Sequence, residues 1–221
     1  MISNKMSGNS ATGDFRDTDF LPAAGLHFLT PAYELLAWPM LAGVWRGVVD
    51  DVCQRAGQAA SIVDLGCGPG TVLRRLARRR PDLSLTGVDI DERVLRITRR
   101  RVPRAKLLQG SADNLPVTDA SADIVVSSMV FHHLPREIKL RALAEVNRIL
   151  KPGSVFLLCD FARPTTRLGA WFVRSFAMLE SGVGRQAAGE LQELAASSAM
   201  ALTPLWTRLG CITQHEVRAA S

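Results

Sequence analysis

The segment at residues 63–70, with the sequence VDLGCGPG, constrains the fold more than any other part of this 221-residue chain. A short apolar run ends at Val63, an acid follows at Asp64, and glycine then occupies alternate positions. Glycine has no Cβ and adopts positive φ, so such a loop lets a ligand approach bare backbone. A helical pattern begins at Thr71 and points its N-terminus at the same place. The segment therefore predicts a strand, a ligand-binding turn and a helix, an arrangement that suits a nucleoside-bearing ligand.

Hydrophobic periodicity extends this unit into an alternation of strands and helices up to residue 160. The expected strands cover residues 61–64, 83–89, 105–109, 124–128 and 154–159. Their continuous apolar character predicts a sheet covered on both faces, and the alternation with helices predicts parallel strands. Residues 201–208 and 212–217 indicate a terminal hairpin. We predict an α/β fold with a Rossmann-like, seven-stranded, mostly parallel sheet, helices on both faces and a terminal antiparallel hairpin.

The chain outside this unit predicts three further regions. Residues 1–20 are rich in Ser, Asn, Gly and Asp, which predicts a flexible tail before a single domain at residues 21–221. Residues 21–55 predict N-terminal helices, interrupted at Pro31 and Pro39. Residues 163–200 contain apolar helical stretches, interrupted at Gly182 and Gly184, and predict a cap over the substrate.

The net charge of +6 comes almost entirely from arginine. A basic balance is compatible with nucleic acid, anionic lipid or an acidic substrate. Residues 71–80, however, alternate arginines with apolar residues, as the polar side of an amphipathic helix does. We therefore expect solvated helix faces, and the chain lacks the aromatic and basic stripe of a nucleic-acid surface.

The cysteines and the apolar runs indicate the compartment. The four cysteines form no CxxC pair, so neither a disulfide framework nor a zinc site is expected, and a reducing compartment fits. The N-terminus lacks the charged-then-apolar plan of a signal peptide, and no uncharged apolar run is long enough to span a bilayer. The expected location is cytoplasmic.

Four segments are expected to meet at the carboxyl ends of the strands, where open α/β sheets bind ligands. The glycine loop follows the first strand. Asp89 ends the second strand, where an acid can accept hydrogen bonds from a ribose diol. Residues 111–114 follow the third strand, and Asp113 among them can accept an adenine amino group. Residues 128–133 follow the fourth strand and would line the reacting end.

A glycine loop and a ribose acid also occur in dinucleotide dehydrogenases, so these two features alone discriminate weakly. Three details favour a different cofactor. The loop is GxGxG and not GxGxxG; Asp64 would oppose a pyrophosphate but suits a cationic ligand; and residues 111–113 provide a polar adenine edge.

Taken in order, the segments VDLGCGPG, GVDI, GSADNLPV, DIVVSSMVFHHLP and EVNRILKPGSVFLL resemble the successive motifs of class I S-adenosylmethionine-dependent methyltransferases. The resemblance covers residues 61–160, nearly half of the chain. It is strongest to the small-molecule branch around the ubiquinone/menaquinone C-methyltransferases, because CDFARP at residues 159–164 is similar to their acid-Phe-x-Lys/Arg-Pro. The resemblance implies S-adenosylmethionine as cofactor and S-adenosylhomocysteine as product.

The resemblance also implies a role for each matching position. The methionine part lies against the glycine loop, Asp64 attracts its ammonium, Asp89 binds the ribose and Asp113 reads the adenine edge. The implied cofactor-binding residues are Tyr33, Asp64, Gly66, Cys67, Gly68, Asp89, Ile90, Ala112, Asp113, Ser128 and His133. Alternatives stay open for three of them: Asp89 as a helix cap, Asp113 as a turn former and Tyr33 as a packing residue.

The sulfonium is already an activated electrophile, so the protein mainly aligns the reacting atoms in a dry pocket. An O–H, N–H or activated C–H acceptor can also need a base. The nearest candidates are His132 and His133, of which His133 is favoured as a residue of the cofactor shell. No metal is expected, because no ligand triad of the catechol type is present.

The acceptor pocket is expected to come from the N-terminal helices and the cap. The candidate substrate-binding residues are Phe28, Trp38, Trp171 and Phe172, whose apolar character predicts a hydrophobic or aromatic acceptor, and Arg163, which would meet an anionic group. The alternative is that the aromatic side chains pack against the sheet and that the arginine is solvated.

The predicted function is methyl transfer to a small hydrophobic or aromatic acceptor, such as a quinone or a secondary metabolite. The Asn/Asp-Pro-Pro-aromatic motif of adenine and glutamine N-methyltransferases is replaced by SSMV at residues 127–130. A phospholipid N-methyltransferase and a non-catalytic cofactor-binding protein are alternatives, and an NAD-linked oxidoreductase is a distant one. The expected partner is a small molecule and not nucleic acid, with peripheral membrane contact and a homodimer left open.

Overall fold

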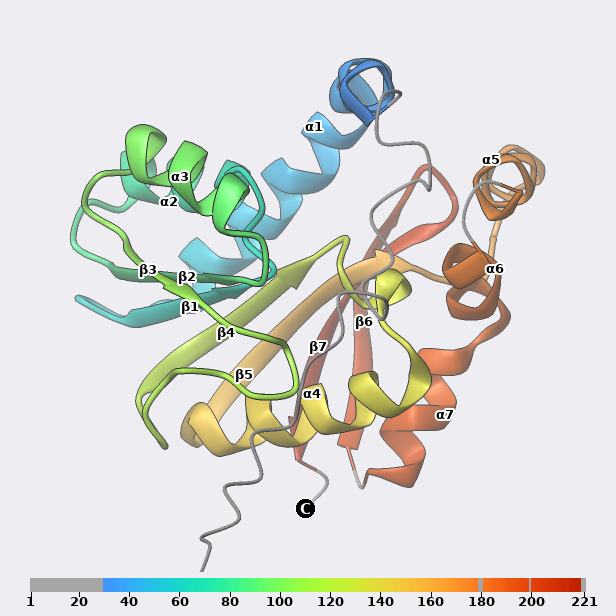
Figure 1. Ribbon diagram of the computed structural model, residues 1–221. Helices are drawn as coiled ribbons and strands as arrows, with labels where there is room; N and C mark the ends of the chain where they lie inside the picture. The colour runs from blue at the N-terminus through green and yellow to red at the C-terminus, as the bar shows by residue number, and fades with distance from the viewer. Residues whose placement is uncertain (1–29, 179–180, 199, 220–221) are drawn as a thin grey trace, which may run out of the picture.

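The computed structural model describes residues 30–178, 181–198 and 200–219. Its centre is one twisted sheet (Figure 1) with the strand order β3-β2-β1-β4-β5-β7-β6. The strands are β1 Ser61–Leu65, β2 Ser84–Asp89, β3 Lys106–Gln109, β4 Ala122–Ser128, β5 Leu150–Phe161, β6 Met200–Arg208 and β7 Ile212–Ala219. The first five strands are parallel, and β7 pairs antiparallel with both β5 and β6. The predicted Rossmann-like sheet with a terminal antiparallel hairpin is confirmed.

Helices cover both faces of the sheet because the strands are apolar on both sides. On one face, Ile62, Ile124 and Leu157 pack against α1, α2 and α3 (Figure 1). On the other face, Val63 and Phe156 pack against α4 and α7. The helices are α1 Thr30–Arg55, α2 Thr71–Arg79, α3 Glu92–Arg101, the 3-10 turn η1 Phe131–His133, α4 Arg136–Ile149, α5 Arg167–Ala177, α6 Ser181–Ala188 and α7 Glu190–Ser197.

The interruption expected at Pro39 is absent from the described part of the N-terminal region. Residues 30–55 form the single helix α1, which continues through Pro39. Pro31 lies in the first turn, where backbone N–H groups have no acceptor within the helix, so the N–H that proline lacks costs no hydrogen bond. The second half of α1 buries Val44, Val48 and Val52 in the core, and this packing stabilises the helix.

The cap also divides differently from the expectation. Gly182 and Gly184 lie inside α6 and do not interrupt it. The helices are interrupted instead between Ala177 and Ser181 and at Gly189, whose φ of +112° separates α6 from α7. A Cβ at Gly182 would collide with the carbonyl oxygen of His132. Glycine at this position therefore serves close packing of α6 on η1, which a helical pattern in the sequence does not reveal.

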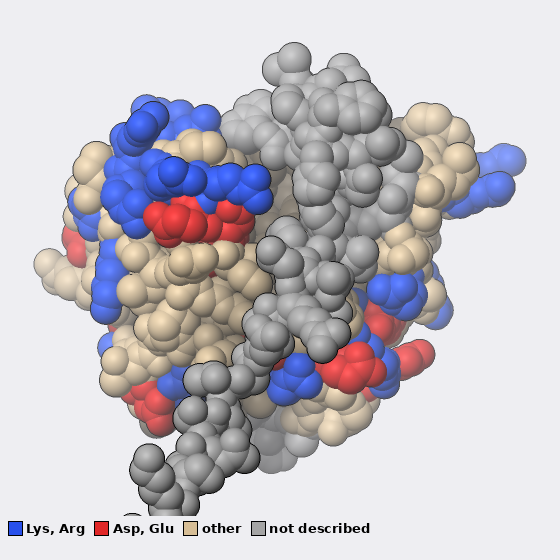
Figure 2. Space-filling view, viewed as in Figure 1, with Lys and Arg blue, Asp and Glu red and all other residues tan. Residues whose placement is uncertain are grey.

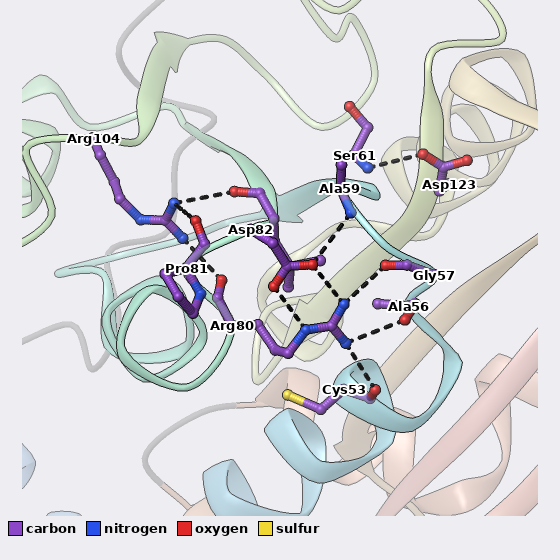
Figure 3. Close-up of polar contacts among 11 residues, drawn as sticks. Cys53, Ala56, Gly57, Ala59, Ser61, Arg80, Pro81, Asp82, Arg104 and Asp123 are labelled. Atoms are coloured by element: carbon purple, nitrogen blue, oxygen red, sulfur yellow. Dashed lines mark hydrogen bonds and ion pairs between the residues drawn. The ribbon is translucent and has the colours of Figure 1, made fainter.

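Two arginines have structural roles at the amino edge of the sheet (Figure 3). Arg80 donates to the carbonyl oxygens of residues 53, 56 and 57, at 3.3, 3.2 and 2.9 Å, and pairs with Asp82. Arg104 donates to the carbonyl oxygens of residues 80, 81 and 83. Because the last carbonyl groups of a helix have no partner within the helix, Arg80 caps the end of α1. Part of the arginine excess is thus used inside the fold.

Candidate active site

The glycine loop between β1 and α2 contains three left-handed residues, Gly66, Gly68 and Gly70, with φ of +69°, +51° and +77°. A Cβ at Gly66 would lie 2.5 Å from the Val130 side chain, and one at Gly70 would lie 2.6 Å from Thr98. Among the described residues, a Cβ at Gly68 would meet nothing within 4 Å. Gly66 and Gly70 are therefore required by neighbouring side chains, whereas Gly68 leaves an open space that a ligand can enter.

The N–H groups of this loop hold it against the end of β2. Gly66 and Cys67 both donate to the carbonyl oxygen of Val88, at 2.8 and 3.1 Å. Gly68 donates to Oδ2 of Asp89 at 2.8 Å. These three donors, which the resemblance assigned to the methionine part, are engaged with the protein. If the loop backbone binds the methionine part of the cofactor, as predicted, the contact must be made at the open space beside Gly68.

Asp64 is the most unusual side chain of the site. It lies on β1, is 2% exposed, and its Oδ2 has no hydrogen-bond partner among the described residues. Burial, and next the charge of Asp89, raise its pKa to about 8. A buried carboxyl oxygen without a partner is costly. Asp64 is thus suited to a cationic donor such as an ammonium group.

Asp89 ends β2 and braces the loop. Besides Gly68, it accepts a hydrogen bond from the N–H of Asp91 at 3.0 Å through Oδ1. Burial raises the pKa of Asp89. Asp91 caps α3, since its side chain accepts from the N–H of Arg93 at 2.7 Å. The alternative of Asp89 as the helix cap is thereby removed, and the half-buried Ile90 follows it at the same edge.

The predicted adenine edge carries an ion pair that sequence reasoning missed. Asp113 accepts a hydrogen bond from the Ser111 hydroxyl and pairs with Arg141 of α4 at 2.9 Å. Burial raises the pKa of Asp113, but the hydrogen bonds from Ser111 and Arg141 outweigh burial and the net pKa is lowered. An adenine amino group would share this carboxylate with Arg141, beside the half-buried Ala112.

The turn after β4 brings two histidines to the carboxyl edge, beyond the half-buried Ser128. The rings of His132 and His133 lie 3.9 Å apart, and the His133 N–H donates to the carbonyl oxygen of Val130 at 3.0 Å. His132 is 4% exposed. Its Nδ1 lies 2.7 Å from Oδ1 of Asp160, and its N–H donates to Oδ2 of the same carboxylate at 3.1 Å. His132, one of the two predicted candidates, is therefore held by a buried acid.

Asp160 is a site residue for which sequence reasoning proposed no role. It lies near the end of β5 and is fully buried. Burial raises its pKa, whereas the charge of His132 and its hydrogen bond lower it, and the net pKa is lowered. The acid of the CDFARP segment was the available signal, but its partner lies 28 residues away on another element.

The predicted acceptor residues fall into two groups. Phe172 is buried and stacks on Phe176 at 4.3 Å, and both rings lie beside Phe161, whose ring meets His132 edge-on at 5.0 Å. Trp171 and Arg163 are exposed to solvent. Phe28 lies outside the described residues, and for Tyr33 and Trp38 the structure describes only the backbone of α1.

The opposite edge of the sheet is a poorer candidate. A cavity of about 530 Å³ lies at the amino ends of the strands, lined in part by Arg55, Lys151 and Arg218. All three cations are paired, with Glu216 or with Asp123. Within the described ranges, no group of three or more His, Cys, Asp or Glu side chains could hold a metal ion. None of the helices described is long and apolar enough to cross a membrane.

Solved structures of methyltransferases share this fold. The mitomycin 7-O-methyltransferase MmcR is 21% identical, with a TM-score of 0.67, over 88% of this chain and 59% of that one. An S-adenosyl-L-methionine-dependent methyltransferase from Methanococcus maripaludis, described as putative, is 17% identical, with a TM-score of 0.63, over 96% of both chains. At these identities the likeness shows the fold alone.

Sequence comparison gives the family of the central segment. Residues 62–153 match the family described as "Methyltransferase domain". The uncharacterized methyltransferase Rv0089 of Mycobacterium tuberculosis is 35% identical over 117 residues, which are 52% of this chain and 57% of that one. The phthiotriol/phenolphthiotriol dimycocerosates methyltransferase of the same organism is 34% identical over 112 residues, 50% of this chain and 40% of that one.

The chain therefore spans about half of the length of the curated relatives that it matches. Over residues 62–153 the chain is thus similar to a methyltransferase domain, and its fold is shared with solved S-adenosylmethionine-dependent methyltransferases.

Proposed function

We propose that this protein transfers the methyl group of S-adenosylmethionine to a small hydrophobic or aromatic acceptor. The observation that carries the proposal is the position of the aromatic cluster, defined as Phe161, Phe172 and Phe176. It borders the His132–Asp160 pair at the carboxyl ends of β4 and β5. Val130, just before this pair, contacts the glycine loop at Gly66. An apolar acceptor site thus adjoins both a base and the cofactor loop.

The residues around the loop fit the cofactor. Oδ2 of Asp64, which has no hydrogen-bond partner in the described part of the chain, suits the cofactor ammonium. The space that the described residues leave open at Gly68 admits a ligand against the backbone. Asp89 would accept the ribose hydroxyls with the lone pairs that its two backbone hydrogen bonds leave available. When bound, the cofactor supplies a methyl group on a positively charged sulfur, which needs alignment more than activation.

His132 would serve as the base for an acceptor O–H or N–H. Oδ1 of Asp160 accepts a hydrogen bond from Nδ1–H of His132, so Nε2 is the ring nitrogen whose lone pair takes the proton. The buried carboxylate also stabilises the imidazolium that forms when the proton arrives. General base catalysis of this kind contributes about 10²- to 10⁴-fold in rate. His133, whose ring packs on that of His132, is proposed to border the methionyl group.

The named relatives support this class of acceptor. One is named for phthiotriol dimycocerosates and a structural neighbour for the 7-O position of mitomycin, and both names denote small molecules. A quinone or another secondary metabolite belongs to the same class. In the phospholipid alternative the methylated atom is the headgroup nitrogen, and a direct assay distinguishes this acceptor from a small aromatic one.

The test is a panel of phenols, quinones, amines and phosphatidylethanolamine, each incubated with protein and S-adenosylmethionine and analysed by mass spectrometry. The proposal predicts S-adenosylhomocysteine together with an acceptor that is heavier by one methylene. Methylation of phosphatidylethanolamine alone supports the phospholipid alternative. Cofactor binding without turnover on any acceptor supports a non-catalytic binding protein.

A further inference from the structure

Helix α5 exposes an apolar face that the fold leaves uncovered. Leu168, Trp171 and Met178 are 70%, 65% and 85% exposed, and they are three of five large apolar side chains exposed in the described part of the chain. Their spacings of three and seven residues place them on one side of the helix and its C-terminal cap. Monomeric proteins rarely gather such side chains without a function.

The opposite side of α5 holds the helix firmly on the body of the protein. Phe172 and Val173 are buried, and Thr166 caps the helix by accepting from the N–H of Gly169 at 3.0 Å. A Cβ at Gly169 would collide with the carbonyl oxygen of Gly210, so the helix lies directly against the terminal hairpin. The apolar side chains are therefore presented outward by a fixed helix.

Basic residues surround this face. Arg163, Arg167 and Arg174 are exposed, and residues 161–179 contain no Asp or Glu. Figure 2 shows basic side chains beside uncharged surface where Figure 1 places α5. A second copy of the chain docking face to face would bring these arginines against their own equivalents, which opposes a symmetric dimer here. The charge instead complements an anionic surface.

We propose that the α5 face, defined as Leu168, Trp171 and Met178 with Arg167 and Arg174, docks the protein on an anionic lipid surface. A helix with Trp and Leu on one side and arginine beside them is suited to lie in the membrane interface. Each arginine near an anionic leaflet adds about 1 kcal/mol of attraction, a factor of about five in partitioning.

The inner side of the same helix reaches the reacting end. Phe172 and Phe176 connect α5 to Phe161 and, through it, to His132. A hydrophobic acceptor dissolved in the bilayer would thus enter beside the helix that contacts the membrane. This consequence depends on the proposed function, whereas docking itself does not.

The test is co-sedimentation with vesicles, which needs no turnover. Wild-type protein should sediment with vesicles of equal parts phosphatidylcholine and phosphatidylglycerol and not with phosphatidylcholine alone, and salt should weaken the binding. The double substitution Leu168→Ser and Trp171→Ser should lower partitioning by at least about tenfold, from the lost apolar burial. Arg167→Gln with Arg174→Gln should lower it by about fivefold for each charge.

The matched control is Ile97→Ser. Ile97 is a 43% exposed side chain on α3, where arginines also gather (Figure 2), and its loss should leave sedimentation unchanged. The proposal is overturned if wild-type protein ignores anionic vesicles, if neither double variant loses binding, or if Ile97→Ser weakens binding equally. A dimer in size-exclusion chromatography that the Leu168 and Trp171 variant abolishes would also overturn it. Titration with S-adenosylhomocysteine checks that each variant is folded. A failure of the docking proposal therefore does not contradict the proposed methyl transfer.

Discussion

The Nδ1 atom of His132 lies 2.7 Å from Oδ1 of Asp160, and both side chains are buried at the carboxyl edge of the sheet. The same carboxylate accepts a hydrogen bond from the backbone N–H of His132, so the acid holds both the ring and the backbone of this residue in place. A buried acid that orients a histidine in this way sets which ring nitrogen carries the proton. The pair is therefore the feature on which the proposed chemistry depends.

Replacing His132 with glutamine should reduce kcat by at least about 100-fold while cofactor affinity stays within twofold of the wild-type value, because the base is lost and the cofactor contacts remain. The matched variant is His133→Gln, which should weaken cofactor binding more than it slows turnover. Steady-state kinetics and titration calorimetry measure both. Equal kcat losses in the two variants would contradict the assignment of His132 as the base.

Asp160→Asn should keep the fold and change the pH dependence of turnover. The amide can no longer stabilise a protonated His132, so kcat should drop by about 100-fold and its dependence on pH should differ from that of the wild type. A pH–rate profile and circular dichroism are the measurements. A variant with an unchanged profile would show that Asp160 only supports the packing around it.

Alanine at two glycines of the loop should separate folding from binding. Gly68→Ala meets open space and costs about 1–2 kcal/mol for the left-handed conformation, but its methyl group enters the cofactor space and should weaken binding by more than tenfold. Gly66→Ala adds a collision with Val130 and should destabilise the protein more strongly. Denaturant unfolding and calorimetry on both variants distinguish these effects. Normal cofactor affinity in Gly68→Ala would place the cofactor elsewhere.

Asp64 should make the stability of the free protein depend on pH. Burial, and next Asp89, raise its pKa from 3.8 to about 8. Between these values the folded protein keeps a proton that the unfolded chain releases, so the contribution of Asp64 to stability falls as pH rises from 3.8 towards 8. Asp64→Asn should therefore raise the free energy of unfolding by about 1 kcal/mol or more at pH 8.

The same Asp64→Asn variant should bind S-adenosylhomocysteine more weakly than wild type, because the amide offers no charge to the ammonium. Chemical denaturation near pH 5 and pH 8, together with calorimetry, gives both quantities. A variant that loses stability at the higher pH, or that binds the ligand as tightly as wild type, would contradict this role.

The buried ion pair between α4 and α7 should stabilise the position of the cap. Nζ of Lys139 lies 2.5 Å from Oε2 of Glu190 and 2.9 Å from Oε1 of Gln186, and Lys139 is fully buried. Lys139→Met should cost about 3–5 kcal/mol, since it leaves Glu190 without its partner. For a chain of this size the midpoint of thermal unfolding should fall by about 10 °C. Adding Glu190→Leu should recover most of the loss, and failure to recover would contradict this explanation.

The sequence predicted what local chemistry determines. The glycine loop, the acid at Asp89 and the parallel order of the strands follow from turn residues and from apolar periodicity, and the structure has them where expected. Partners that are distant along the chain were missed. Asp160 and Arg141 each pair with a residue 28 positions away on another element. Glycine occupies position 182 inside a helix because α6 packs closely on the backbone of His132. Tertiary contacts of this kind leave no periodic pattern in one sequence.

Titration calorimetry of the intact protein with S-adenosylhomocysteine tests the cofactor site most directly. The wild-type protein should bind one equivalent, NADH should not compete, and Asp89→Ala should lower the affinity by at least about tenfold through the loss of charged hydrogen bonds. No binding by the folded wild-type protein, or equal affinity in Asp89→Ala, would contradict the central claim that this edge of the sheet holds S-adenosylmethionine.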